Sequence, residues 1–287
     1  MSTPADPGRQ HRLWARAEAA AAVLGPLALP RPQGRRRGGQ EGIHRSRVAG
    51  EGRDFWQFRP LEPGESREQV DWRRSARSDA LYVRTHEREQ PARLLLWVDP
   101  SPSMAYASAP GLPTKADHAR LLAGALCAAV ARAGERVAAL GEARAASPRL
   151  VFEHLSGVAV PDLRRVPLAA GDRLLLASDF LDPAVTDAVA ALAVRGAPGL
   201  LLQVADPAEI SFPFTGRVAL HDLDPTATER VVDAGPEARA RYLAVWQAHL
   251  DRVAAAARAV GWQWRLEATD RPLSRALADA ARALVGP

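Results

Sequence analysis

The sequence predicts a doubly wound α/β fold with a mostly parallel sheet, and three observations support this fold class. Unbroken apolar runs at 94–98, 174–177 and 200–204 indicate strands that are covered on both faces. Helical patterns at 114–133 and 184–195 separate these runs, and such alternation is typical of parallel strands joined by crossover helices. Polar, turn-forming residues follow the apolar runs directly. We therefore expect the first of these strands to lie inside the sheet, with functional residues at its carboxyl end.

The chain divides into four segments at changes of composition. A helix is predicted over 8–24, where Leu13, Trp14, Ala17, Ala21 and Leu24 share one face. A basic, Gly-rich loop follows, and then an extended, β-rich segment that we expect to pack on the core. The predicted boundaries are 1–30 for the N-terminal helix, 31–42 for the loop, 43–92 for the extended segment and 93–287 for the α/β domain.

The remaining elements are placed by local pattern. In the extended segment, residues 81–85 alternate as a strand would. In the α/β domain we predict short strands at 137–140 and 150–152, a hairpin or edge strand within 212–220, a helix at 236–259, a strand at 262–266 and a last helix at 273–285.

The charge balance is basic, but the composition itself accounts for much of it. The chain has 38 basic and 33 acidic residues, and the excess of +5 lies in residues 1–90, which hold 17 basic and 12 acidic residues. Such an excess could serve nucleic acid or an anionic surface. However, Lys115 is the only lysine, so an Arg- and Ala-rich coding bias explains the high basicity, and no aromatic-interleaved basic patch is present.

Cysteine content and hydropathy indicate a cytoplasmic protein. The single cysteine, Cys127, stands in an apolar helical pattern, where we expect it to be buried and inert. The sequence has no apolar stretch long enough for a membrane span. The apolar stretch at 19–29 follows Glu18 and is interrupted by Pro26, so it does not match a signal peptide.

Oxygen-bearing side chains follow two of the apolar strands. Asp99, Ser101 and Ser103 come directly after the first strand, in the sequence D-P-S-P-S-M, and Asp179 follows the second. The carboxyl ends of neighbouring parallel strands share one edge, so we expect these four residues to converge there. Their oxygens are hard ligands suited to Mg²⁺ or a similar divalent cation. The alternative is an ordinary turn in which Asp99 bonds backbone amides.

The D-x-S-x-S spacing resembles the first motif of the metal-ion-dependent adhesion site in von Willebrand factor A domains, which bind partners through a metal and usually do no chemistry. This resemblance implies that Asp179 supplies the third motif. The middle motif of those domains is a threonine, but residues 153–172 contain none, and Ser156 is the only hydroxyl in that span. The resemblance therefore implies a partial metal site.

A longer series of motifs, over about residues 40–135, resembles the bacterial family called domain of unknown function fifty-eight, whose core is von Willebrand factor A-like. The series runs G-x-H-x-S, G-x-G-x-x-F, P-G-E, V-D-W-x-x-S-A-R and L-x-V-R before D-x-S-x-S-M. The family usually has P-G-D-D, where this chain has Glu65 and Ser66. Asp71, Trp72 and Arg77 belong to this signature. They form either a structural corner or a partner-binding patch.

The resemblance implies a non-enzymatic interaction module, because members of this family often accompany MoxR-type AAA+ ATPases and could act as their adaptors. The partner would then be such an ATPase together with a client protein, with no specific nucleic acid. One alternative is a Mg²⁺-dependent phosphoester hydrolase, in which Asp99 and Asp179 hold the ion and His154 is the only nearby base. The sequence has no phosphate-binding glycine loop to support it. The other alternative is a nucleic-acid-binding module that uses residues 31–47.

Overall fold

The computed structural model describes residues 7–30, 49–61, 70–76, 80–87, 93–155, 165–169, 171–220 and 230–286. The chain forms two compact units, one of residues 1–32 with 92–287 and one of residues 33–91. The larger unit contains the α/β core, and each unit is described by itself.

The core of the larger unit is a parallel sheet of five strands in the order β4-β3-β5-β6-β9. β3 lies between β4 and β5, so the predicted interior position of the first apolar strand is confirmed. All four pairings are parallel, which requires a crossover connection between each strand and the next. The strands are β3 (Arg93–Val98), β4 (Arg136–Ala139), β5 (Arg173–Ser178), β6 (Gly199–Ala205) and β9 (Gln263–Ala268).

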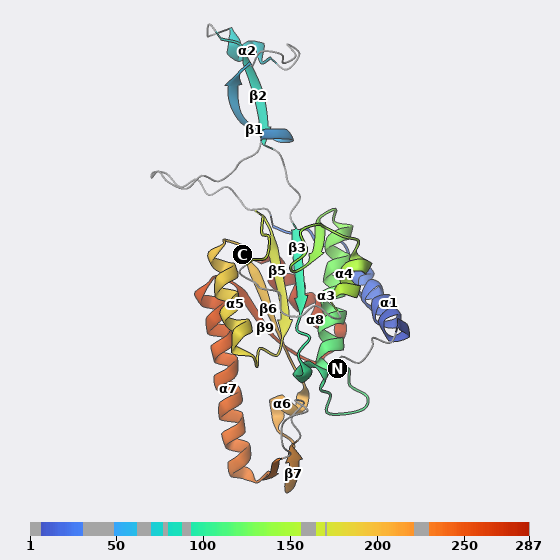
Figure 1. Ribbon diagram of the computed structural model, residues 1–287. Coiled ribbons are helices and arrows are strands. Elements are labelled where there is room, and N and C mark those ends of the chain that lie inside the picture. The colour runs from blue at the N-terminus through green and yellow to red at the C-terminus, as the bar shows by residue number, and fades with distance from the viewer. Residues whose placement is uncertain are drawn as a thin grey trace. The chain divides into compact units, whose positions relative to one another are not determined.

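Helices cover both faces of this sheet, as the predicted doubly wound fold requires (Figure 1). On β3, Leu94 and Leu96 enter one hydrophobic cluster, whereas Leu95 and Trp97 enter the other. The side chains of both clusters are buried, which explains why these strands are apolar throughout. One face carries α1 (Pro7–Leu24), α3 (Lys115–Arg132), α4 (Pro148–His154) and α8 (Leu273–Val285), and the other carries α5 (Pro183–Val194) and α7 (Pro236–Ala259).

The N-terminal helix α1 is part of this core. Leu13, Trp14, Ala17 and Ala21 are buried against α3 and α4, and the Trp14 and Phe152 ring centroids lie 5.4 Å apart. The apolar face predicted from the sequence is therefore the face that docks.

The segment at 150–152 is helical rather than a strand, so that expectation was wrong. The Ser147 hydroxyl accepts a hydrogen bond from the Leu150 amide at 3.4 Å, and Pro148 occupies the first turn of α4. A capping serine followed by proline is a helix-start signal, and it outweighs a three-residue apolar run.

A short helix and a β-hairpin follow β6 in the sequence. The short helix α6 (Pro207–Ser211) follows β6 directly. β7 (Arg217–Leu220) then pairs antiparallel with β8 (Arg230–Asp233), which places the hairpin expected after residue 212.

The smaller unit contains an antiparallel pair of strands, β1 (Ala49–Pro60) and β2 (Tyr82–Glu87), whose register shifts within β1. A single helical turn, α2 (Trp72–Ser75), lies between them in sequence. The expectation that this segment packs on the α/β core stays a prediction.

Candidate functional site at the carboxyl edge of the sheet

The strand order places a topological switch point between β3 and β5. Counted from β3 as the first strand of the sheet, the order is 2-1-3-4-5, which is a common doubly wound order. In such sheets ligands bind outside the carboxyl ends of the two strands where the order reverses. Asp99 follows β3 and Asp179 follows β5, and the Asp99 amide donates to the Ala177 carbonyl at 2.9 Å. The two predicted carboxylates thus stand at the edge where this fold places its ligands.

Asp99 ties the two loops of this edge together. Its side chain is only 3% exposed, and Oδ1 accepts a hydrogen bond from the Ser101 amide at 2.8 Å. Its Oδ2 accepts from the Ser178 hydroxyl at 2.5 Å, and Ser178 Oγ accepts from the Phe180 amide at 2.8 Å. A carboxylate that accepts a hydrogen bond from a backbone amide two residues later forms an ordinary turn, which is the alternative to a metal ligand.

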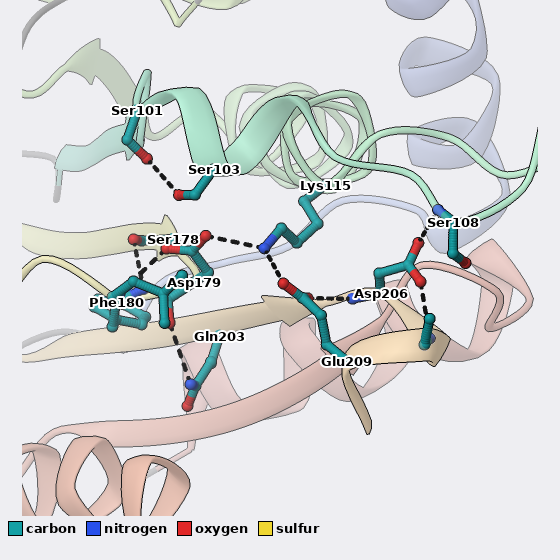
Figure 2. A network of polar contacts seen from close by, with 12 residues as sticks. Ser101, Ser103, Ser108, Lys115, Ser178, Asp179, Phe180, Gln203, Asp206 and Glu209 are labelled. Carbon is teal, nitrogen blue, oxygen red and sulfur yellow. Dashed lines mark hydrogen bonds and ion pairs between the residues drawn. The ribbon is translucent and has the colours of Figure 1, made fainter. Parts of the chain in front are cut away.

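The two serines of the motif contact each other. Ser101 precedes the short 3₁₀ helix η2 (Pro102–Ala105), which contains Ser103. Their hydroxyl oxygens are 3.0 Å apart, and both residues are half-buried (Figure 2). One hydroxyl therefore donates to the other, and the pair forms the most accessible oxygens of the predicted site.

Asp179 is paired with the side chain of Lys115, the first residue of α3. The Lys115 Nζ lies 3.0 Å from Asp179 Oδ2 and 2.6 Å from Glu209 Oε1, and its side chain is 1% exposed (Figure 2). Burial alone lowers the pKa of this amine, but the charges and hydrogen bonds of the two carboxylates outweigh burial and raise the pKa above the ordinary value of a lysine. Lys115 is therefore an ammonium ion at neutral pH.

Glu209 and Asp206 extend this contact to β6 and α6. They form a capping box at the start of α6, in which Glu209 Oε2 accepts from the Asp206 amide at 2.8 Å. Asp206 also accepts from the amides of Ala208 and Ser108, at 2.8 and 2.9 Å. We call the set of joined residues the edge network: Asp99, Lys115, Ser178, Asp179, Asp206 and Glu209.

The turn after Asp179 is held in an unusual backbone conformation. Phe180 has φ of 56°, in the left-handed region that few residues other than glycine adopt. The Asp179 carbonyl accepts from Gln203 Nε2 at 3.3 Å and contacts His249 Nε2 at 2.9 Å. Both of these side chains are buried, Gln203 on β6 and His249 on α7, so these two elements hold the turn in place.

The edge network as arranged does not fit a divalent cation. Both oxygens of Asp99 accept hydrogen bonds, and Asp179 accepts from Lys115 and from the Leu181 amide at 3.2 Å. Mg²⁺ needs oxygens at about 2.0–2.1 Å, and the ammonium beside Asp179 would repel it. In the part of the chain that the structure describes, no group of three or more His, Cys, Asp or Glu side chains is arranged to hold a metal. Ser156, the weak candidate, lies outside the described residues.

The family-signature residues belong to the smaller unit. The Asp71 side chain caps α2 by accepting from the Arg74 amide at 3.0 Å, and Trp72 is 61% exposed. The Arg74 guanidinium lies over the Tyr82 ring, 5.5 Å from its centre, in a cation–π contact within the same unit. Arg77 lies outside the described residues. Asp71 thus caps a helical turn within its own unit. The two alternatives, a corner that pins this segment to the core and a partner-binding patch, both stay predictions.

Sequence reasoning missed Lys115 and Glu209 as site residues. The available signal was compositional, because Lys115 is the only lysine in a chain with 38 basic residues. Glu209 carried the weaker signal of a capping box, Asp206 to Glu209, at the end of a buried strand.

The fold and the edge network define a doubly wound α/β protein with a polar network at its switch point. The chain belongs to the family described as "Protein of unknown function DUF58", whose model matches residues 57–252, and the resemblance seen in the sequence is thereby confirmed. A solved structure, the "conserved hypothetical protein BatB from Bacteroides thetaiotaomicron", is 13% identical, with a TM-score of 0.39 over 68% of this chain and 100% of that chain. A similarity this slight carries no functional argument. No curated protein matches the chain. Among the described helices, none combines the length and apolar character needed to cross a bilayer.

Proposed function

We propose that this protein is a non-enzymatic interaction module of the cytoplasm and that its partner is a MoxR-type AAA+ ATPase. Membership of the family supports the choice of partner, because members of the family often accompany such ATPases. The carboxyl edge of the sheet is the proposed contact surface, since ligands of this fold class bind there.

One observation supports the non-enzymatic part of the proposal: the carboxylates of the edge network already accept hydrogen bonds from donors of the protein itself. Asp99, Asp179 and Asp206 are each at most 3% exposed, and each accepts hydrogen bonds from neighbouring donors. A general base or nucleophile needs a reacting atom within reach of substrate. Groups that are buried and saturated instead make a rigid support for the loops above them.

The surface above this support is suited to a protein contact. Pro100 and Pro102 are exposed in the motif loop, and Leu181 is 52% exposed in the next loop. An exposed leucine in the loop after β5 and two half-buried hydroxyls in the loop after β3 offer both apolar and hydrogen-bonding contacts at the same edge of the sheet, as interface cores do.

The phosphoester hydrolase alternative is weaker. His154, its candidate base, stands at the end of α4, where Nδ1 contacts the Leu150 carbonyl at 2.7 Å, and it is not part of the edge network. The nucleic-acid alternative uses residues 31–47, which lie outside the described residues.

The decisive experiment is a binding assay between the immobilised protein and the purified MoxR-type ATPase encoded by the same genome. Two variants with matched chemistry locate the contact. Leu181→Glu places a charge at the carboxyl edge, and Val194→Glu does so at the opposite end of α5, where the valine is 88% exposed. We expect binding by wild type and Val194→Glu, and a loss of ~10-fold or more for Leu181→Glu, because one central apolar contact commonly contributes this much.

Three results would contradict the proposal. The ATPase could fail to bind in every nucleotide state, or Leu181→Glu could bind as well as Val194→Glu. Alternatively, the isolated protein could cleave a generic phosphoester with Mg²⁺, which would favour the hydrolase. Retention on nucleic acid with a steep loss at higher salt would favour the third hypothesis.

A further inference from the structure

We propose that Lys115 is the resident cation of the carboxyl edge, and that its ammonium group takes the place of a divalent metal ion. Carboxylates from two different elements, Asp179 after β5 and Glu209 in α6, converge on the Lys115 Nζ at 3.0 and 2.6 Å. The Lys115 and Asp179 side chains are 1% and 2% exposed. The Glu209 side chain is 19% exposed. Two carboxylates that face each other in a partly buried site repel, and an ammonium between them offsets this repulsion; here the chain itself supplies that cation.

The carboxylate oxygens around the ammonium already accept hydrogen bonds, so they are not available as metal ligands. Asp179 uses Oδ2 for Lys115 and Oδ1 for the Leu181 amide, and Glu209 uses Oε1 for Lys115 and Oε2 for the Asp206 amide. Each carboxylate oxygen of this pair thus faces a donor supplied by the protein. The donors of the protein itself therefore satisfy the four carboxylate oxygens of Asp179 and Glu209.

Composition supports the same conclusion independently of the distances. The chain uses arginine for its basic residues with one exception, and the exception is Lys115. This residue is also among the largest fully buried side chains of the described protein. An ammonium is a compact point charge with three donors, whereas guanidinium is a broad planar fork. A site that must hold a small cation between two carboxylates explains why this position has lysine where the rest of the chain uses arginine.

The inference deepens the proposed function and rests on it in one respect. If the ATPase binds at this edge, no metal ion joins the edge to a carboxylate of the ATPase. The charge of Lys115 is already balanced by Asp179 and Glu209, so an incoming partner carboxylate finds no free cation. Binding of the ATPase is accordingly expected to be unchanged by a chelator.

The test uses the isolated protein, so its outcome does not depend on the ATPase. Thermal unfolding of wild type is followed with a chelator and with Mg²⁺, Mn²⁺ or Ca²⁺, and calorimetry measures ion binding directly. Lys115→Met leaves Asp179 and Glu209 without a cation. We expect its unfolding midpoint to fall by roughly 5–15 °C and to recover partly with divalent ions, which the freed carboxylates can then bind.

A matched control comes from the opposite end of β3. The Arg93 Nη2 pairs with Asp172 Oδ2 at 2.7 Å, and both side chains are largely buried. Arg93→Met should also lower the midpoint, but divalent ions should not restore it, because this pair has only one carboxylate. A double variant, Lys115→Met with Asp179→Asn, should be more stable than Lys115→Met alone and should lose the response to ions.

Wild-type calorimetry keeps the test decisive even if Lys115→Met does not fold. Saturable binding of a divalent ion to wild type, with a higher unfolding midpoint, would overturn the inference and make the metal the resident cation. A Lys115→Met variant as stable as wild type would overturn it as well. Failure of the ATPase to bind, with these ion results as expected, would reject the proposed function alone.

Discussion

Replacing Asp99 tests whether the motif carboxylate holds the structure or a ligand. Two donors, the Ser101 amide and the Ser178 hydroxyl, lie at 2.8 and 2.5 Å from its two oxygens. A hydrogen bond to a charged group contributes about 1.5–3 kcal/mol, so Asp99→Ala should lower the free energy of unfolding by about 3–6 kcal/mol. That is a large share of the ~5–15 kcal/mol by which domains are stable.

Asp99→Asn should have a smaller effect, which separates hydrogen bonding from charge. The amide oxygen can still accept from the Ser101 amide, but the NH₂ group meets Ser178 Oγ, which then loses its acceptor. We expect a loss of about 1–3 kcal/mol. Ser101→Ala is the control, because it removes only the contact between Ser101 and Ser103 and keeps the backbone donor, so a loss under about 1 kcal/mol is expected.

Urea unfolding at constant ionic strength, with a chelator present, measures all three variants. The order of stability should be wild type, Ser101→Ala, Asp99→Asn and Asp99→Ala, with equal slopes. If Asp99→Ala unfolds within about 0.5 kcal/mol of wild type, the carboxylate does not hold the two loops. Its burial would then serve a ligand, and the metal hypothesis would regain its main support.

Three further predictions concern the core. Gly124→Ala gains about 1 kcal/mol of helix propensity, but its Cβ would lie 2.6 Å from the buried Phe152 ring, and overpacking costs about 1–3 kcal/mol, so the variant should gain no stability and should lose up to about 2 kcal/mol in urea unfolding. The matched change Gly111→Ala, with no atom within 4 Å of the new Cβ, should have almost no effect, and equal results for the two would contradict the packing argument. The Cys127 thiol, whose pKa burial raises to about 12, should react with a thiol reagent only as fast as the protein opens; rapid labelling of native protein at neutral pH would refute this. Burial likewise raises the pKa of Tyr242 to about 12, so both groups keep in the fold a proton that the unfolded chain loses near pH 9–10. Stability should therefore decline as the pH rises toward 12, and an unfolding midpoint that is flat over this range would contradict it.

The sheet was predictable because each of its inner strands is covered on two faces. Apolar runs such as 94–98 alternate with helical patterns along the chain, which favours buried parallel strands, and the polar residues that end each run mark the carboxyl edge. The helix at 148–154 was not recognised, because a short apolar run suits a strand or a buried helix equally well. There the capping signal of Ser147 and Pro148 decided the structure.

The sequence predicted at which edge of the sheet the site lies, but not which residues pair there. Strand ends place Asp99 and Asp179, but the donors that satisfy them depend on how α3 and α6 pack. Lys115 is 64 residues from Asp179 and 94 from Glu209 in the chain, so no local pattern connects them. The pairing arises because the first turn of α3 lies over the carboxyl ends of β5 and β6, which is a property of the tertiary structure.

The single lysine nevertheless supports a specific prediction about the size of the cation that fits at position 115. Lys115→Arg keeps the charge and follows the preference of the rest of the chain, yet the position is 1% exposed and bounded by Asp179 and Glu209. The larger, planar guanidinium would have to displace one of these carboxylates or the neighbouring packing, and overpacking of this kind costs about 1–3 kcal/mol. Urea unfolding of Lys115→Arg should therefore show a clear loss of stability, while Arg132→Lys, in the last turn of the same helix, should change little. If Lys115→Arg is as stable as wild type, either cation fits between the two carboxylates, and the structure does not explain why this position has lysine rather than arginine.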